Sequence, residues 1–377
     1  MRIALLTYST KPRGGVVHTL ALAEALARAG QDVHVWTLGR GGDTCFFRPV
    51  DDAVTVHAVP FEPRDAEDVG ARIVRSIATL RTAFAGARER FGYDVVHAQD
   101  CISANAALPC IRTIHHLDTF TTRELAACHE RAVVDPSALI CVSVAVAAEV
   151  NAGWGRDPAV IPNGVAATRF SDVPGDAVSG WTERFGRYVL ALGGIEPRKG
   201  SIDLLEAMAL VQRRHPDVRL VFAGGETLFD YRDYRAEFEL RAAALGVDHE
   251  IIGVVDDDAL PGLVAGAAVL GFASTKEGFG LAAMEALAAR VPVVARDLPV
   301  LREVFGDTVS YATDPGSIAA AVSAQLERPA DPAAGAALAA SYTWEAAASA
   351  HLEFYAGVGP GTGSSRATSP GRQRCRP

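Results

Sequence analysis

The chain has 377 residues, and at ~150 residues per domain this length predicts two domains of ordinary size. Hydrophobic residues make up 49% of the sequence and charged residues 21%, a composition that excludes a disordered or collagen-like chain. The formal net charge of -9 argues against nucleic-acid binding by the whole surface, because that mode requires an excess of lysine and arginine.

The first element, Arg2–Ser9, is predicted to be a buried strand. Its apolar run is too short for a signal peptide and is not followed by a small-residue cleavage site. No later run reaches the ~18 to 20 apolar residues that span a bilayer. The 6 cysteines contain no C-x-x-C pair and are expected to be buried thiols in a reducing compartment. We therefore expect a soluble, cytoplasmic protein; contact with a membrane is not indicated but stays open.

In the first half, short runs rich in Val, Ile and Leu alternate with longer segments of helical period. This alternation is typical of βαβ units and a parallel sheet. The segment Asp65–Phe91 has apolar residues at spacings of three and four, so it predicts one long helix with a buried face. The other predicted strands of this half are Asp32–Leu38, Val54–Val59, Asp94–Ala98, Cys110–His115, Ala138–Val142 and Ala159–Ile161.

The same alternation resumes at Arg187, which predicts a second α/β domain over residues 187–342 after a first over residues 1–172. Residues 173–186 contain proline and glycine with little apolar periodicity and are expected to form an interdomain linker. The predicted strands of the second half are Tyr188–Leu192, Arg219–Ala223, Glu250–Ile252, Val269–Phe272, Val291–Ala295 and Val309–Tyr311.

A final helix, Trp344–Tyr355 within residues 343–356, is predicted to start behind Thr343 as its N-cap. From Gly357 onward apolar residues nearly disappear and arginines accumulate. Residues 357–377 are therefore expected to be a disordered tail.

Ligands of open parallel sheets bind beyond the carboxyl ends of the strands, so the turns that follow strands are the first places to look for a site. The first such turn contains Lys11, Arg13, Gly14 and Gly15, which combine cations with a backbone that can approach a ligand closely. A purely structural turn is the alternative. Neither a G-x-G-x-x-G fingerprint nor a P-loop occurs, so a nicotinamide-dependent dehydrogenase is not supported.

The corresponding turn of the second half runs from Gly193 through Gly194 to Gly200 and includes Arg198 and Lys199. The guanidinium fork, the ammonium group and the N-terminus of the following helix are groups that together hold a diphosphate without a metal ion. A solvated surface turn is the alternative.

A third turn holds Glu277 before a predicted helix and Glu285 within it. Each carboxylate can accept hydrogen bonds from two neighbouring hydroxyls, which suits a ribose at one end of a ligand and a hexose at the other. The N–H groups between the two acids would face phosphate; they belong to Gly278, Phe279, Gly280 and Leu281. Unrelated glutamates on a surface helix are the alternative.

Taken in order along nearly the whole chain, these motifs resemble the retaining GT-B glycosyltransferases of glycosyltransferase family 4. The resemblance implies two Rossmann-like domains that face a central cleft, with the last helix crossing back to the first domain. The residues that carry it are Gly14-Gly15, Asp94–His97, Thr113–His115, Cys141–Ser143, Ile161–Val165, Gly194–Gly200 and Glu277–Glu285.

The resemblance also implies roles for single residues. Arg198 and Lys199 would bind the diphosphate of a nucleotide sugar, Glu277 the transferred sugar and Glu285 the ribose, while His115 would lie near the donor sugar. A structural role for His115 stays open. The first domain would supply the acceptor site and the Gly14-Gly15 loop. The leaving diphosphate would help to deprotonate the acceptor hydroxyl on the same face, which retains the anomeric configuration.

The expected enzyme is thus a retaining hexosyltransferase that needs no metal or other cofactor. Its donor is expected to be UDP-linked rather than GDP- or ADP-linked, and its acceptor is an unassigned metabolite, lipid or glycan. A nucleotide-sugar epimerase of the same fold and a non-catalytic nucleotide-sugar-binding protein are the alternatives. Two positions depart from the family: Arg290 stands where glycine is common, and Ala166 where aspartate often follows Asn163-Gly164-Val165. Helix ends of this kind favour glycine, so with Arg290 at this position the sequence does not decide whether the helix-to-strand turn forms.

Overall fold

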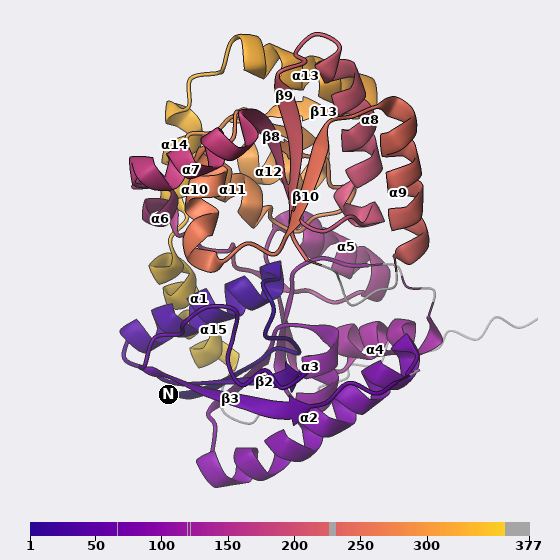
Figure 1. The fold of residues 1–377 in the computed structure, drawn as a ribbon. Helices are drawn as coiled ribbons and strands as arrows, with labels where there is room; N and C mark the ends of the chain where they lie inside the picture. Colours follow the sequence, from indigo (N-terminus) through magenta and orange to yellow (C-terminus); the bar gives the residue numbers. More distant parts are fainter. Residues whose placement is uncertain (66, 119, 121, 226–230, 359–377) are drawn as a thin grey trace, which may run out of the picture.

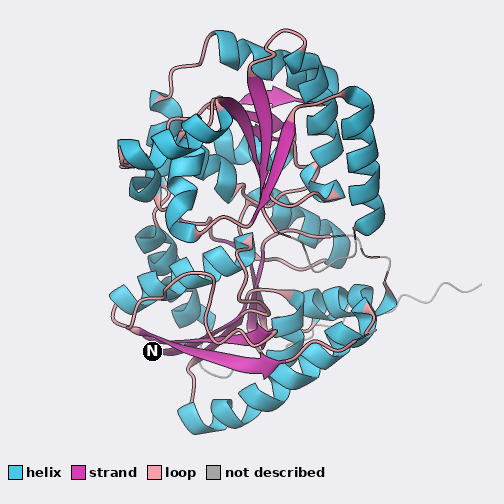
Figure 2. Cartoon of the chain, in the orientation of Figure 1, coloured by secondary structure: helices cyan, strands magenta, loops and turns pink. Residues whose placement is uncertain are grey.

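A computed structural model gives the structure of the protein, described for residues 1–65, 67–118, 120, 122–225 and 231–358. Two parallel sheets lie in two α/β domains, one above the other in Figure 1, with helices on both sides of the strands (Figure 2). The structure thus confirms the predicted GT-B class of fold, two doubly wound sheets that face each other.

The first sheet has seven parallel strands in the order β3-β2-β1-β4-β5-β6-β7. Its strands are β1 Arg2–Leu6, β2 Asp32–Arg40, β3 Val54–Phe61, β4 Val95–Ala98, β5 Ile111–Ile114, β6 Ala138–Cys141 and β7 Ala159–Val160. The helices of this part of the chain are α1 Gly14–Arg28, α2 Val69–Phe91, α3 Cys101–Ala107, α4 Arg123–Val134, α5 Val144–Trp154 and α6 Ala167–Ser171. Near-continuous Val, Ile and Leu runs form the strands because helices cover both faces of the sheet.

The second sheet has six parallel strands in the order β10-β9-β8-β11-β12-β13. They are β8 Arg187–Leu192, β9 Val218–Ala223, β10 His249–Gly253, β11 Val269–Phe272, β12 Val293–Arg296 and β13 Ser310–Ala312. The α-helices are α7 Gly175–Phe185, α8 Ser201–Gln212, α9 Arg232–Leu245, α10 Leu260–Ala265, α11 Leu281–Ala288, α12 Pro299–Phe305, α13 Pro315–Glu327 and α14 Ala333–Ser341. Short 3-10 helices are η1 Pro197–Lys199 and η2 Asp257–Ala259.

Each sheet reverses its strand order once, between β1 and β4 in the first sheet and between β8 and β11 in the second. In such sheets the chain leaves neighbouring strands in opposite directions at this point, which opens a crevice beyond their carboxyl ends. The loops that follow β1, β4, β8 and β11 are therefore the places where the fold positions a ligand.

The segment 173–186, predicted to be a linker, contains a regular helix. Trp181 and Phe185 lie one turn apart in α7, stack with ring centroids 5.7 Å apart, and Phe185 contacts Tyr188 of β8 edge-to-face. Two aromatic residues at helical spacing supply enough buried surface to fix this helix, although the segment lacks a longer apolar stripe. The preceding helix α6 also packs against α10, α11 and α14 of the second domain.

Arg290 lies between α11 and β12 with a φ of 61°, the only positive φ outside glycine among the described residues. The backbone N–H groups of Arg290 and Val291 still donate to the carbonyl oxygens of Leu287 and Ala286. The helix-to-strand turn therefore forms without the glycine that the family commonly has there, and an arginine adopts the left-handed conformation at some cost in strain.

The C-terminal helix α15, Trp344–Val358, crosses back to the first domain and packs against α1, as predicted (Figure 1). The Thr343 hydroxyl accepts from the N–H of Ala346 at 3.1 Å, and Tyr355 reaches the buried His97 of β4. The helix extends two residues into the segment predicted to be a disordered tail; residues 359–377 lie outside the described part of the chain. Among the described residues, no helix combines the length and apolarity needed to cross a bilayer.

Candidate active site

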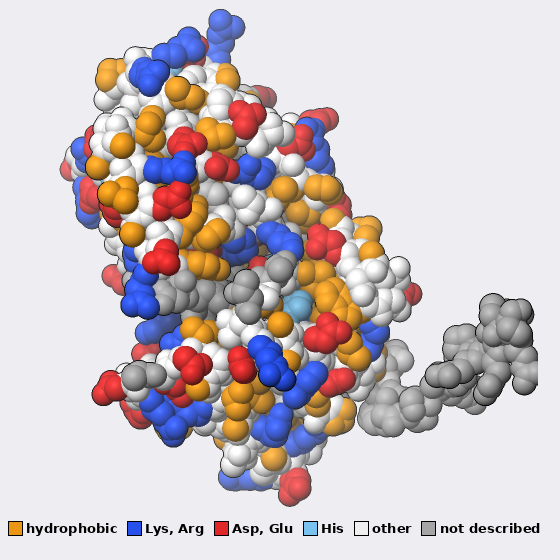
Figure 3. Space-filling model, turned by 90° about the vertical axis from the view of Figure 1, so that its right-hand side faces the viewer, with side chains coloured by type: hydrophobic (Ala, Val, Ile, Leu, Met, Phe, Trp, Pro, Cys, Tyr) orange, Lys and Arg blue, Asp and Glu red, His pale blue; other side chains and the backbone are white. Residues whose placement is uncertain are grey.

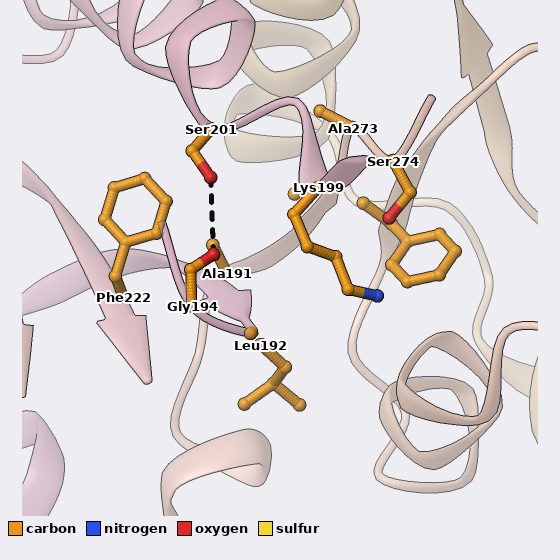
Figure 4. Close-up of a pocket in the computed structure, with 11 residues that line it drawn as sticks. Ala191, Leu192, Gly194, Lys199, Ser201, Phe222, Ala273 and Ser274 are labelled. Carbon is orange, nitrogen blue, oxygen red and sulfur yellow. Dashed lines mark hydrogen bonds between the residues drawn. The ribbon is translucent and has the colours of Figure 1, made fainter. Parts of the chain in front are cut away.

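A pocket lies at the carboxyl ends of β8 and β11 in the second sheet, where the strand order reverses (Figure 4). Close backbone packing shapes it: a Cβ on Gly194 would lie 2.5 Å from the carbonyl oxygen of Gly225, and Gly200 has a φ of 62°. The glycines of the predicted turn are therefore required by the backbone path. The lining residues are Ala191, Leu192, Gly193, Gly194, Lys199, Ser201, Phe222, Gly271, Phe272, Ala273 and Ser274.

Two cations of this turn converge on one carboxylate. Lys199 Nζ lies 2.5 Å and Arg198 Nη1 3.4 Å from Glu277 Oε1. The other side of the Arg198 guanidinium contacts Glu196 Oε1 at 3.1 Å. We call Glu196, Arg198, Lys199 and Glu277 the strand-end cluster. Because these side chains are mostly buried, their charges are poorly screened by water.

The pKa values reflect this pairing. Burial alone would raise the pKa of Glu277, but Lys199 and Arg198 outweigh burial and lower it to about 2. Burial alone would lower the pKa of Arg198, yet Glu277, Glu196 and Asp118 raise it above its ordinary value. Glu277 and Arg198 are therefore both ionised near neutral pH, and their charges are held in place before any ligand arrives.

The loop between Glu277 and α11 touches the first domain. A Cβ on Gly278 would fall 1.4 Å from the carbonyl oxygen of His115, so only glycine fits there. Phe279 is buried and contacts Tyr342 edge-to-face, while Gly280, with a φ of 94°, precedes Leu281 at the start of α11. The N–H groups at this helix start are thus held beside the domain boundary.

His115 follows β5 in the first domain and lies partly buried against Gly15. A Cβ on Gly15 would lie 3.5 Å from the His115 ring, whereas nothing lies within 4 Å of the equivalent position on Gly14. His115 Nε2 is buried without a hydrogen-bond partner. Burial, together with His116 and Arg112, lowers the pKa of His115 to about 3, so the ring is neutral and keeps one nitrogen for a ligand.

The residues after His115 bring the first domain toward the strand-end cluster. His116 Nε2 lies 3.0 Å from Asp118 Oδ2. Burial would raise the pKa of Asp118, but His116, Arg198 and Lys276 lower it below its ordinary value. Lys and Arg side chains and a histidine line the hollow between the two domains in Figure 3. Cationic groups of the second domain therefore face a polar loop of the first.

Glu285 lies apart from the strand-end cluster. Burial raises its pKa to about 7, opposed by nearby Arg169 and reinforced by Asp257. Arg169 and Asp257 form an ion pair of their own at 2.8 Å. The two acids that the sequence places eight residues apart thus occupy different electrostatic surroundings, one a strong acid and one poised near neutrality.

The structure brings together Arg198, Lys199 and Glu277 from two turns, and Gly15 and Gly278 around His115 from two domains. Sequence reasoning missed Glu196, because a glutamate in a loop carries no signal until its guanidinium partner is known. It also missed Glu303 of α12, whose carboxylate accepts from the N–H groups of Val144 and Ala145 at the start of α5 in the other domain. No group of side chains able to hold a metal ion occurs within the described residues.

Two family models match the chain. One, glycosyl transferases group 1, covers residues 184–332, and the other, Glycosyltransferase Family 4, covers residues 12–169. The chain is 30% identical to the glycogen synthase of Mycobacterium tuberculosis over 94% of each chain. It belongs to the group 1 glycosyltransferases of family 4.

Other relatives carry different names. The chain is 30% identical to the phosphatidyl-myo-inositol mannosyltransferase of Mycobacterium leprae, over 94% of this chain and 96% of the relative. It is 28% identical to the D-inositol 3-phosphate glycosyltransferase of Xylanimonas cellulosilytica, over 94% of this chain and 96% of the relative. This protein is accordingly a glycosyltransferase, and the relatives differ in the acceptors that their names give.

Solved structures share the fold. Anabaena HepE in complex with UDP and glucose superposes with a TM-score of 0.73 at 20% identity, over 95% of this chain and 100% of that one. Sucrose-phosphate synthase from Thermosynechococcus elongatus superposes with a TM-score of 0.76 at 19% identity, over 95% of this chain and 98% of that one. At this identity the likeness establishes the arrangement of the two domains and nothing finer.

Proposed function

We propose that this glycosyltransferase moves a hexose from a nucleotide diphosphate sugar to an acceptor hydroxyl with retention of the anomeric configuration and without a metal ion. One observation carries the proposal: Lys199 and Arg198 converge at the carboxyl end of the second sheet, beside a glycine-lined pocket. Two fixed cations at this place neutralise the charge that a departing diphosphate develops, which is the task a metal ion performs elsewhere.

In the proposed reaction a bond forms between the acceptor oxygen and the anomeric carbon while the bond from that carbon to the diphosphate breaks. The acceptor proton passes to the departing diphosphate on the same face of the sugar, so no protein nucleophile is needed. Arg198 and Lys199 stabilise the leaving group, helped by the N–H groups of Gly278–Leu281 at the start of α11. Glu277 accepts hydrogen bonds from hydroxyl groups of the sugar once Arg198 and Lys199 also bind the diphosphate.

The remaining roles belong to residues with free capacity for hydrogen bonds. The unpartnered Nε2 of His115 would contact the donor sugar, and Glu285 would accept from the ribose hydroxyls. A UDP-linked donor is favoured because Anabaena HepE, which shares the fold, is described in complex with UDP and glucose. Gly14, Gly15 and Gly194 would let the backbone approach the donor closely.

The test is incubation of the full chain with a panel of UDP-, GDP- and ADP-linked sugars and candidate acceptors, with and without a chelator. NMR of the product anomeric proton reports the configuration. We expect transfer with retention from a UDP-sugar and no loss of rate with chelator. An inverted product, strict loss of activity with chelator, or donor epimerised at C2 without any transfer would each contradict the proposal.

A further inference from the structure

Two cysteines of the first domain lie side by side, although they are far apart in the sequence. Cys101 begins α3 and Cys128 lies in the middle of α4, and these two helices pack against each other. The side-chain Nδ2 of Asn105 donates to the carbonyl oxygens of Cys101 at 2.8 Å and of Cys128 at 2.7 Å. The same nitrogen lies 3.5 Å from the Cys128 sulfur. One buried amide group thus holds the two cysteines together.

The two thiols are also in contact. A side-chain hydrogen bond joins them, and both side chains belong to one apolar cluster with Ile102 and Leu125. Both cysteines are free; Cys101 is partly exposed, whereas Cys128 is only 5% exposed. Cys101 is therefore the sulfur that a reagent from solvent reaches first, with Cys128 in contact behind it.

A buried arginine acts on this pair. Arg112 of β5 is 4% exposed, and its Nε and Nη1 are buried without a hydrogen-bond partner. The hydrogen bond from Cys128 and the positive charge of Arg112 lower the pKa of Cys101, against the opposing effects of burial and of Asp100. The nucleophilic form of cysteine is the thiolate, and at Cys101 a fixed cation and a thiol donor stabilise it.

Two other cysteines of the same domain lack this environment. Cys110, just before β5, and Cys141, at the end of β6, are buried. Burial raises the pKa of each thiol to about 12. Both stay protonated near neutral pH, and a buried thiol in this form is inert toward disulfides. The reactivity expected of Cys101 therefore comes from its neighbours and is not shared by every cysteine of the domain.

We propose that Cys101 and Cys128 form a site of reversible oxidative modification, at which a disulfide bond joins α3 to α4. The oxidant is a low-molecular-weight disulfide, RSSR. The Cys101 thiolate, after losing its proton to solvent, attacks one sulfur of RSSR, which forms a mixed disulfide and releases one RS⁻. The Cys128 sulfur then attacks the Cys101 sulfur and displaces the second RS⁻. The two cysteines lose two electrons and two protons, which leave with two molecules of RSH.

The bond would form where the first sheet reverses its strand order. Asp100, the residue before Cys101, accepts from the backbone N–H groups of Tyr8 at 2.9 Å and Ser103 at 2.8 Å. This carboxylate ties the end of β4 to the end of β1 and caps α3. The proposed disulfide thus belongs to the first domain, whereas the strand-end cluster belongs to the second, and it does not depend on the proposed function.

The test incubates the full chain with glutathione disulfide and identifies the products by mass spectrometry of non-reduced peptides. The chain carries Cys45→Ser and Cys375→Ser, because Cys45 is exposed and Cys375 lies outside the described residues. We expect a peptide in which Cys101 and Cys128 are cross-linked and which dithiothreitol separates again. Cys110 and Cys141 are expected to stay unmodified and serve as internal controls.

Single variants in the same background assign the two roles. Cys128→Ser should accumulate Cys101 joined to one glutathione, since no second thiol is present to displace it. Cys101→Ser should take up roughly 10-fold less glutathione than Cys128→Ser, because the activated thiolate is lost. Serine has nearly the shape of cysteine, and circular dichroism checks that each variant is folded.

A pH series with iodoacetamide adds a measurement that requires no change at the pair. Cys101 should reach half of its maximal labelling rate at a lower pH in the folded chain than in the chain unfolded in urea. The proposal is overturned if the folded chain gives no peptide with Cys101 joined to Cys128, if Cys128→Ser carries no glutathione on Cys101, or if folding leaves the labelling midpoint of Cys101 unchanged or higher.

Discussion

The two crevices of the molecule treat their charges in opposite ways. In the second domain Arg198 and Lys199 are paired with Glu277 and Glu196 before any ligand is present. In the first domain Arg40 is partly buried and Arg112 is buried, and neither forms an ion pair with a carboxylate among the described residues. Paired cations are held rigidly and are neutral as a group, while unpaired ones lack a fixed counter-charge. We infer that the paired cations of the second domain are preorganised for the diphosphate of the proposed donor.

The largest effect is expected from the paired side. Lys199→Ala should reduce kcat/KM for transfer by roughly 30- to 1000-fold, the equivalent of about 2 to 4 kcal/mol, because one preorganised charge on the leaving group is lost. Arg198→Ala should behave similarly. The control is Arg213→Ala, which removes an exposed arginine at the C-terminal end of α8. Unchanged turnover in both second-domain variants would refute the diphosphate assignment.

Glu285 provides the next test, through pH. Its pKa of about 7 means that the carboxylate protonates as the pH falls through neutrality. Protonation turns one oxygen into a donor and removes the charge that strengthens the hydrogen bonds from two ribose hydroxyls. Donor affinity should therefore fall about tenfold between pH 8 and pH 6 in the unaltered chain. Glu285→Gln should bind the donor weakly at both pH values. Calorimetry that shows the same pH dependence in both proteins would reject this role.

A smaller effect is expected where the two domains are joined. Glu303 accepts from Val144 and Ala145 at the N-terminus of α5, at 2.7 and 2.8 Å. A carboxylate at this place also interacts favourably with the helix dipole, so Glu303→Gln should lower the free energy of unfolding by about 1 kcal/mol. The exposed Glu89→Gln should leave it unchanged. Thermal unfolding followed by circular dichroism measures both, and equal midpoints would show that the contact is not formed in solution.

The smallest effect concerns Arg290, which has a φ of 61°. Arg290→Gly should relieve about 1 to 2 kcal/mol of strain and lose part of this gain to the greater freedom of glycine in the unfolded chain. The net expectation is a stabilisation of about 0.5 to 1 kcal/mol with unchanged transfer. A lower midpoint of chemical unfolding would show that the arginine side chain contributes contacts that outweigh the strain.

Local patterns predicted most strands, because buried parallel strands are continuous apolar runs bounded by turns. They also predicted the turns with Arg198, Lys199 and Glu277, whose glycines stand in close backbone packing. The helix α7 was not predicted, because two aromatic residues among glycines give only a weak helical periodicity of apolar positions. Contacts between distant segments were out of reach: Tyr8 meets Arg40 and Asp100 only because β2, β1 and β4 are neighbours in the sheet.

The most direct measurement is a crystal structure of the chain with UDP or the accepted UDP-sugar. We predict that both phosphates lie within hydrogen-bond distance of Arg198 and Lys199 at the carboxyl ends of β8 and β11, and that Glu285 accepts hydrogen bonds from the ribose hydroxyls. A nucleotide found elsewhere, with Lys199 still paired to Glu277 and untouched by phosphate, would contradict it.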